Sequence, residues 1–235
     1  MNKKIEEIKK TESSPKVVRN IFSKNDIDKF LKLYHDLPVT VHNKKQNVIK
    51  KRWLQGYDAN LEKLYYDKLF KEIGDFEYDN LKDEKEKDIL GLIQESYAPI
   101  GLHVDAGFNV NSQIYKQILV PLSSVGSTII FKNRFYNGST NFTQDPDELK
   151  KKNLGYGQNK RSNVHLKMFG NKEFDKNIQR KYLNHESLEN LKGLEVELIY
   201  EWEVGSILIF DRSHLHCSSS VIKGKKIGIA TFTKR

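Results

Sequence analysis

The stretch Glu201–Arg235 constrains the fold of this chain more than any other stretch. It contains the apolar run Ile207–Phe210 and, near its end, a second run rich in β-forming residues, with a polar segment between them. Short apolar runs that glycines and polar residues interrupt are typical of buried strands. The polar segment carries His214 and His216 directly after the first run. The stretch therefore predicts two core strands with histidines at their polar edge.

A second polar motif lies far upstream, in the sequence GLHVDAG at positions 101–107, and supplies His103 and Asp105. With seven histidines and 31 acidic residues in 235 positions, about one His-x-acid match is expected by chance, and only one occurs. The downstream pattern of His216 followed by Lys226 supports a functional interpretation of this match. Two histidines and one carboxylate can hold non-haem Fe(II) and leave positions open. A cation ten residues after the last histidine can pair with a dicarboxylate on that iron.

With these residues the chain resembles the 2-oxoglutarate- and Fe(II)-dependent dioxygenases, in particular the branch related to prolyl hydroxylases. The matching residues are His103-Val104-Asp105, His216 and Gly224-Lys225-Lys226, and the resemblance covers roughly residues 90–232, with poor coverage between 134 and 194. Many members carry Arg-x-Ser at the last site, whereas this chain has Lys226-Ile227-Gly228 and loses a possible hydroxyl contact.

The resemblance implies that His103, Asp105 and His216 bind Fe(II) and that Lys226 binds the 5-carboxylate of 2-oxoglutarate, with Tyr97 as a further contact. It also implies O2 as a co-substrate, succinate and CO2 as products, and a hydroxylated substrate. Two choices stay open: His214 competes with His216, and Lys225 competes with Lys226. Alternation along a strand places Lys226, Gly228 and Ala230 on one face, where the small residues would leave room for the co-substrate. Tyr97 also fits a simple core aromatic.

The order of the expected elements indicates a mainly β (α+β) fold, a double-stranded β-helix or jelly roll with supporting helices near the N-terminus. Ser23 with Asp26 predicts a capping box for one helix, and Asn60 is expected to cap a second. Strands are expected at 89–97, 112–122, 127–132, 194–202 and in the two final runs. Residues 1–16 are expected to form a flexible basic tail, and residues 17–235 a single domain. Within it, the polar insertion 134–193 is expected to act as a lid or substrate-binding segment.

Composition limits the remaining classes of function. The net charge is +9, but the lysines are interleaved with acids, which favours a solvated surface over a nucleic-acid interface. The single cysteine, Cys217, suits a reducing cytoplasm, and no apolar run reaches the length of a membrane span. The expected enzyme acts on a small-molecule, amino-acid or peptidyl substrate. The alternatives are a cupin-like metal-binding module without catalysis and an oxygenase acting on nucleic acid.

Overall fold

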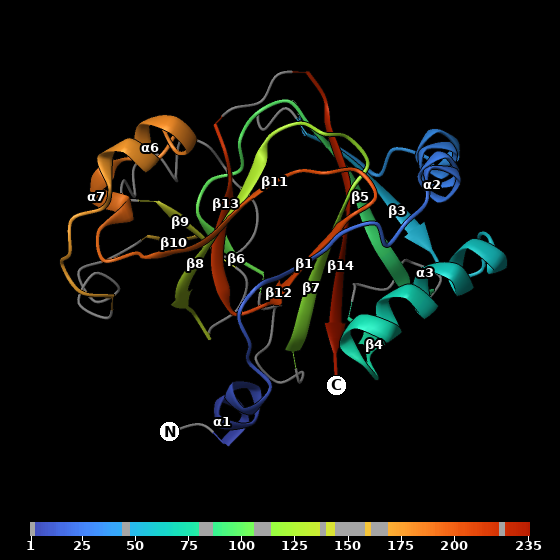
Figure 1. The fold of residues 1–235 in the computed structure, drawn as a ribbon, viewed down its shortest axis with the longest axis horizontal. Helices are drawn as coiled ribbons and strands as arrows, with labels where there is room; N and C mark the ends of the chain where they lie inside the picture. The colour runs from blue at the N-terminus through green and yellow to red at the C-terminus, as the bar shows by residue number, and fades with distance from the viewer. Residues whose placement is uncertain are drawn as a thin grey trace.

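Two β-sheets face each other at the centre of the molecule (Figure 1). The computed structural model describes residues 3–43, 48–79, 87–105, 114–136, 140–143, 158–160, 169–220 and 224–235. The larger sheet has the order β1-β12-β7-β14-β5-β3-β2, and β4 pairs with β14. Its strands are β1 (Lys16–Val18), β2 (Val41–Asn43), β3 (Val48–Leu54), β4 (Glu77–Tyr78), β5 (Ile89–Ser96), β7 (Ile114–Pro121), β12 (Ile207–Asp211) and β14 (Lys226–Lys234).

The smaller sheet has the order β10-β9-β6-β13-β8-β11. Its strands are β6 (His103–Val104), β8 (Ser127–Arg134), β9 (Thr140–Thr143), β10 (Gln158–Lys160), β11 (Val196–Glu201) and β13 (His214–Ser218). Successive strands cross between the sheets: β5, β7 and β12 belong to the larger sheet, and β6, β8 and β13, which follow them, belong to the smaller one. This alternation of antiparallel strands confirms the predicted mainly β jelly roll.

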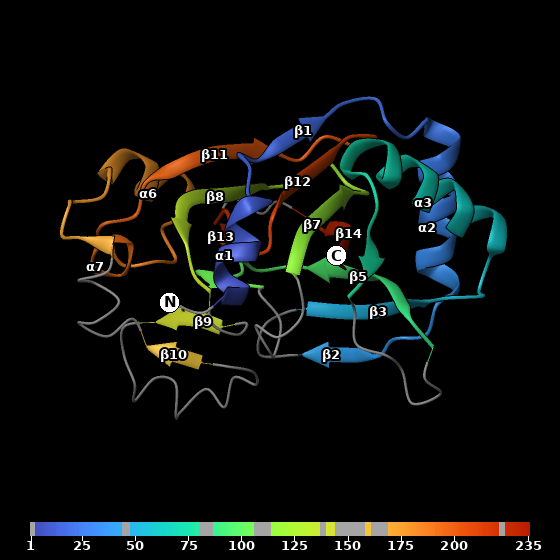
Figure 2. The same cartoon turned by 90° about the horizontal axis from the view of Figure 1, so that it is seen from below.

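Two helices support the outer face of the larger sheet, α2 (Lys24–Asp36) and α3 (Ala59–Ile73) (Figure 2). Phe30 of α2 and Tyr65 of α3 pack against Trp53 of β3, and all three side chains are fully buried. Burying large aromatic surfaces in this way is the main stabilising contribution of such helices. The expected supporting helices are therefore present.

The two helix caps differ in how well the sequence predicted them. Ser23 caps α2 in a complete capping box with Asp26, as expected. The cap of α3 is Asp58 rather than Asn60, because the Asp58 carboxylate accepts hydrogen bonds from the amides of Asn60 and Leu61. A carboxylate at this position also interacts favourably with the positive end of the helix dipole. The α3 helix ends at Gly74, whose φ of 72° a glycine adopts easily.

The smaller sheet is covered on its outer face by two short helices, α6 (Lys176–Tyr182) and α7 (Leu188–Leu191). Leu183 and Leu191 pack in one cluster with Phe131 of β8 and with Cys217 of β13. Cys217 is fully buried there, as expected of a packed thiol. Ile130, the neighbour of Phe131, points the other way and packs between the sheets with Leu208 and Phe210.

The predicted insertion 134–193 thus contributes β9 and β10 to the smaller sheet and α6 and α7 to its cover. Residues 137–139, 144–157 and 161–168 lie outside the described residues. The role of the insertion 134–193 as a lid stays a prediction.

Among the helices that the structure describes, none has both the length and the apolar character needed to cross a bilayer.

The N-terminal residues differ from the expected tail, because they form helix α1 (Lys3–Lys10) and contact the core. Ile8 is buried in the cluster of the smaller sheet. The Ser13 amide donates to the Asp211 carboxylate at 2.9 Å, and the Lys116 ammonium donates to the Thr11 carbonyl. These contacts could not be predicted from the sequence, because their partners lie some 100 to 200 positions away in the chain.

Candidate metal centre

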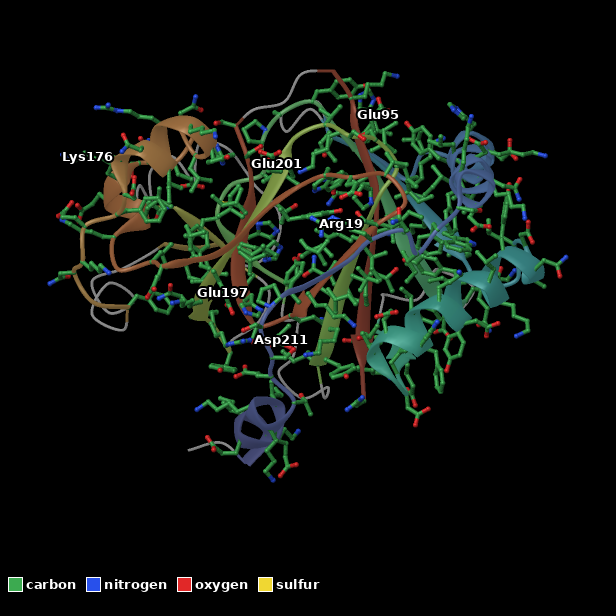
Figure 3. The ribbon with its side chains drawn as sticks, viewed as in Figure 1. Arg19, Glu95, Lys176, Glu197, Glu201 and Asp211 are labelled. Atoms are coloured by element: carbon green, nitrogen blue, oxygen red, sulfur yellow. The ribbon has the colours of Figure 1, made fainter. Side chains whose placement is uncertain are left out.

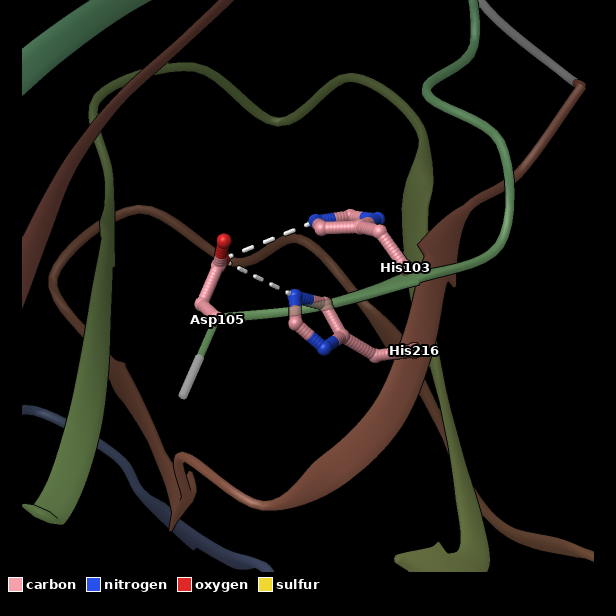
Figure 4. Close-up of side chains that lie close together, drawn as sticks. All are labelled: His103, Asp105 and His216. Atoms are coloured by element: carbon pink, nitrogen blue, oxygen red, sulfur yellow. Dashed lines mark ion pairs between the residues drawn. The ribbon is translucent and has the colours of Figure 1, made fainter. Parts of the chain in front are cut away.

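The pairing of β6 with β13 brings the two predicted histidines together. His103 and His216 are direct partners in this antiparallel ladder, and their ring centroids are 4.1 Å apart. Asp105 lies two residues after His103, so its side chain points to the same side of the chain. The Asp105 Oδ2 atom is 3.6 Å from His103 Nε2 and 3.4 Å from His216 Nε2 (Figure 4). The structure thus brings His103, Asp105 and His216 into one cluster, with one ligand atom from each within 4.8 Å of the others.

Backbone carbonyls orient both imidazole rings. His103 Nδ1 lies 2.7 Å from the Gly101 carbonyl oxygen, and His216 Nδ1 lies 3.1 Å from the His214 carbonyl oxygen. A carbonyl accepts a hydrogen bond, so each Nδ1 carries a proton and Nε2 is the ring nitrogen left to bind a metal. Both Nε2 atoms face the Asp105 carboxylate. This is the usual arrangement of histidines that bind a metal through Nε2.

The distances in the cluster suit a small transition-metal ion. Metal–ligand bonds of about 2.0–2.2 Å at right angles place neighbouring ligand atoms about 3 Å apart. The observed separations of 3.4 and 3.6 Å need only a small closure to reach that value. The side chains of His216, His103 and Asp105 are 4 %, 14 % and 28 % exposed, so one side of the cluster stays open to a ligand.

Two buried side chains hold Asp105 in place. Gln117 of β7 donates from Nε2 to the Asp105 carboxylate at 3.0 Å, and the Arg212 guanidinium donates to the Asp105 carbonyl at 3.1 Å. Burial by itself would raise the pKa of Asp105, but His103 and His216 outweigh burial and hold this pKa well below its usual range. Asp105 is therefore a carboxylate at neutral pH, the form that binds a cation.

His214, the rival of His216, lies in a different environment. The ladder of β13 with β8 shifts register between His214 and His216, so the two residues do not follow simple alternation on one face. His214 Nε2 lies 3.3 Å from the Glu197 carboxylate, and His214 Nδ1 accepts a hydrogen bond from the Asp211 amide. Burial lowers the pKa of His214 to about 4. Among the described residues, His214 does not join the metal-binding cluster.

Lys226 of β14 reaches from the larger sheet across to the smaller one. Its ammonium donates to the carbonyl of Ser127, the first residue of β8, at 3.0 Å, and it lies 4.1 Å from the centre of the Trp202 ring. The residue is only 5 % exposed. In the part of the chain that the structure describes, no carboxylate pairs with this ammonium. Burial lowers the pKa of Lys226 to about 7.

The rival Lys225 is on the other side of the strand. It is 62 % exposed, and its ammonium lies 3.7 Å from the carboxylate of Glu95. Glu95 in turn accepts a hydrogen bond from Tyr34 of α2, which places this contact on the helix-covered side of the larger sheet. The alternation predicted from the sequence, with Lys226 inward and Lys225 outward, agrees with these contacts.

Two expectations about the surroundings of Lys226 are wrong. Gly228 does face the same side as Lys226, but the indole of Trp202 fills the space that was assigned to the co-substrate. A Cβ atom at Gly228 would lie 2.6 Å from that ring. Tyr97 is 44 % exposed, so it is not a core aromatic, and its role in binding the co-substrate stays a prediction.

The sequence did not reveal several residues around the cluster, namely Gln117, Trp202, Arg212 and a further cation, Lys50 of β3. Lys50 lies close enough to Asp105 and His103 for their charges to influence one another. The β3 segment, VIKKRWL, has charged residues at three successive positions, and this hides the alternation by which a strand is recognised. The sequence contains only a weak indication that Arg212 lies near the cluster, namely its position between the core run 207–210 and the histidines.

No protein-family model matches this chain, and no curated protein matches it in sequence. Solved structures match it in fold. HygX from Streptomyces hygroscopicus, solved with nickel and 2-oxoglutarate bound, aligns with 100 % of this chain and 87 % of its own chain, with a TM-score of 0.53 and 10 % identity. SnoN, a non-haem α-ketoglutarate-dependent epimerase from nogalamycin biosynthesis, aligns with 97 % of this chain and 82 % of its own, with a TM-score of 0.51 and 7 % identity. The chain therefore has the fold of these two proteins.

Proposed function

We propose that this chain is a 2-oxoglutarate- and Fe(II)-dependent oxygenase that hydroxylates a small-molecule, amino-acid or peptidyl substrate. His103, Asp105 and His216 bind the iron, and the Lys226 ammonium binds the distal carboxylate of 2-oxoglutarate. When bound, the iron supplies the chemistry by which O2 oxidises the substrate while 2-oxoglutarate is converted to succinate and CO2.

The observation that carries this proposal is the combination of the metal cluster with a buried ammonium that lacks a carboxylate partner among the described residues. Burying an unpaired ammonium costs free energy, so such a group points to an anionic ligand. The register of β13 on β8 pairs His216 with Ile130, whereas Lys226 reaches Ser127, three residues further along β8. At about 3.3 Å per residue, this places the ammonium about 10 Å along the strand from His216. A five-carbon dicarboxylate can bridge a metal beside His216 and an ammonium at that separation.

The protein groups have separate tasks in this proposal. The two imidazoles and Asp105 would hold the metal, and three protein ligands would leave it able to bind the co-substrate and O2. Gln117 and Arg212 keep Asp105 oriented, since both donate hydrogen bonds to it. The Trp202 indole is fixed by its hydrogen bond to Thr128 Oγ1 at 2.8 Å and keeps water away from the Lys226 ammonium. A metal-binding module without catalysis would account for the three ligands but would give Lys226 no role.

The proposal is tested by anaerobic titration with Fe(II) and then 2-oxoglutarate, followed by a measurement of succinate after O2 is admitted. We expect one Fe(II) per chain, 2-oxoglutarate binding that requires the metal, and succinate release that Asp105→Ala abolishes. Circular dichroism of Asp105→Ala shows whether the fold is intact. Full succinate release by a folded Asp105→Ala variant would contradict the assignment of the metal ligands.

The reaction type is tested by the mass of the product. A substrate that is hydroxylated gains one oxygen atom, and 18O2 places the label in the product. A product without added oxygen would exclude hydroxylation. The release of succinate would then still decide whether the protein turns over 2-oxoglutarate.

A further inference from the structure

Strand β3 presents two cations, Lys50 and Arg52, to the space between the sheets. Lys51 and Trp53, which alternate with them, face the opposite way: Trp53 is fully buried against α2 and α3, and the Lys51 ammonium donates to the Tyr34 carbonyl of α2 at 2.5 Å. The ladder of β3 with β5 is regular from 48 to 53, so strict alternation turns Lys50 and Arg52 away from the helices. Both residues are half-buried.

These two cations have no carboxylate partner within the described ranges of the chain. Three other buried or half-buried cations have one: Lys116 and Arg134 pair with Asp211, and Arg212 pairs with Asp79. Successive residues on one face of a strand are about 6.6 Å apart, so Lys50 and Arg52 can bind one anionic group together. Two neighbouring cations without a carboxylate partner therefore form a candidate binding site for an anionic group.

The site is next to the metal cluster and separate from Lys226. Lys50 interacts electrostatically with both Asp105 and His103. In the larger sheet Lys226 pairs with Ser96 and Ser96 with Val48, so β3 is two strands away from Lys226, about 10 Å sideways. Lys50 is then one inward-facing position further along β3 than Val48. An anion held by Lys50 and Arg52 is therefore distinct from the carboxylate assigned to Lys226, although both lie beside the same metal.

We infer that Lys50 and Arg52 bind an anionic group of the substrate, a carboxylate or a phosphate, and so place an adjacent carbon of that substrate at the metal cluster. This inference rests on the proposed function, since it assigns the substrate of that same site. It names the class of substrate: a small molecule or peptide with an acidic group near the position that is oxidised.

The inference is tested with anion probes on the protein loaded with Zn(II), which is diamagnetic and gives no turnover. The 15N-labelled protein is titrated with inorganic phosphate and, separately, with acetate, at constant ionic strength and with saturating 2-oxoglutarate. The Arg52 Nε–H resonance reports binding. We expect a saturable shift with at least one anion, and a dissociation constant that rises at least about tenfold in Lys50→Gln. Stronger binding of acetate indicates a carboxylate substrate, and stronger binding of phosphate indicates a phosphorylated one.

The matched control is the double variant Lys225→Gln/Lys234→Gln, which removes cations that are 62 % and 36 % exposed. It should bind the probe like the original protein. The inference is overturned if neither anion shifts Arg52, if Lys50→Gln binds as well as the original protein, or if the control loses binding equally. Competition between the probe and 2-oxoglutarate would overturn it as well, by assigning Lys50 and Arg52 to the co-substrate. Failure of 2-oxoglutarate to bind at all would instead contradict the proposed function, while the probe titration without 2-oxoglutarate would still test the anion site.

Discussion

The molecule contains two groups of buried or half-buried cations that differ in their partners. The first group, Lys116, Arg134 and Arg212, contacts the carboxylates of Asp211 and Asp79. Asp211 lies in the lower half of Figure 3, toward the end of the molecule where α1 docks. The second group, Lys226, Lys50 and Arg52, forms no ion pair with a carboxylate among the residues that the structure describes, and Lys50 of this group lies close to the metal cluster.

We expect this difference to separate stability from function. The carboxylate of Asp211 accepts hydrogen bonds from Lys116, Arg134 and the Ser13 amide, and the Glu12 carboxylate lies 3.7 Å from Arg134, so each cation there has an anionic partner inside the protein. Among the described residues the second group has no such ion pair, so an anionic ligand would stabilise its charges. We therefore expect the first group to hold the fold together and the second group to contribute free energy to ligand binding.

The largest effect should come from breaking the paired group. Asp211→Ala leaves Lys116 and Arg134 without their carboxylate in a buried place, because the Asp211 side chain is only 5 % exposed. We expect the free energy of unfolding to fall by about 3–5 kcal/mol, measured by urea denaturation. The matched change in the unpaired group, Lys226→Met, should leave the free energy of unfolding unchanged or raise it. An equal loss in both variants would remove the distinction between the groups.

The next largest effect concerns the affinity for 2-oxoglutarate. A shielded, charge-assisted pair contributes about 1.5–3 kcal/mol, so Lys226→Ala should weaken 2-oxoglutarate binding roughly ten- to a hundredfold. Anaerobic calorimetry with the metal-loaded protein measures this. Metal affinity should change little, because the Lys226 ammonium contacts Ser127 and Trp202 rather than the metal cluster. Unchanged 2-oxoglutarate affinity would show that another cation binds the distal carboxylate.

A pH dependence should follow from the same ammonium. The pKa of Lys226 is lowered by burial to about 7, so above that pH the ligand-free protein carries a neutral amine. A carboxylate favours the ammonium, so binding takes up a proton, and the affinity should fall by up to about tenfold for each pH unit above 7. The Cys217 thiol, whose pKa burial raises well above its usual value, stays neutral in this range. Titrations between pH 7 and 9 measure the slope, and Lys226→Arg, which stays charged, should flatten it. An equal slope in Lys226→Arg would assign the proton to another group.

The smallest effect is expected at the neighbouring lysine. Lys225→Ala removes an exposed ammonium that lies 3.7 Å from Glu95, a weak contact at the surface. Both the free energy of unfolding and the 2-oxoglutarate affinity should stay within about 0.5 kcal/mol of the original protein. A larger loss of 2-oxoglutarate affinity than in Lys226→Ala would mean that the inward-facing lysine has been misassigned.

The sequence by itself determined the elements whose signals are local. Apolar runs predicted β5, β7, β8 and the C-terminal strands, and the Ser23 capping box predicted the start of α2, because these depend on residues only a few positions apart. Spacing along the chain also singled out His103, Asp105, His216 and Lys226. Alternation along one strand placed Lys226 with Gly228 on one face, and the contacts of Lys226 and Lys225 then showed which lysine points inward.

Only the tertiary structure decided what stands next to these residues. The pairing of β6 with β13 set His103 opposite His216, and the register shift in β13 separated His214 from the cluster. The larger sheet brought Lys50 of β3 close to Asp105 and His103, although the charged β3 segment has no clear strand pattern. Contacts across strands depend on register, bulges and the closure of the roll, and these are set by the whole core rather than by neighbours in the sequence.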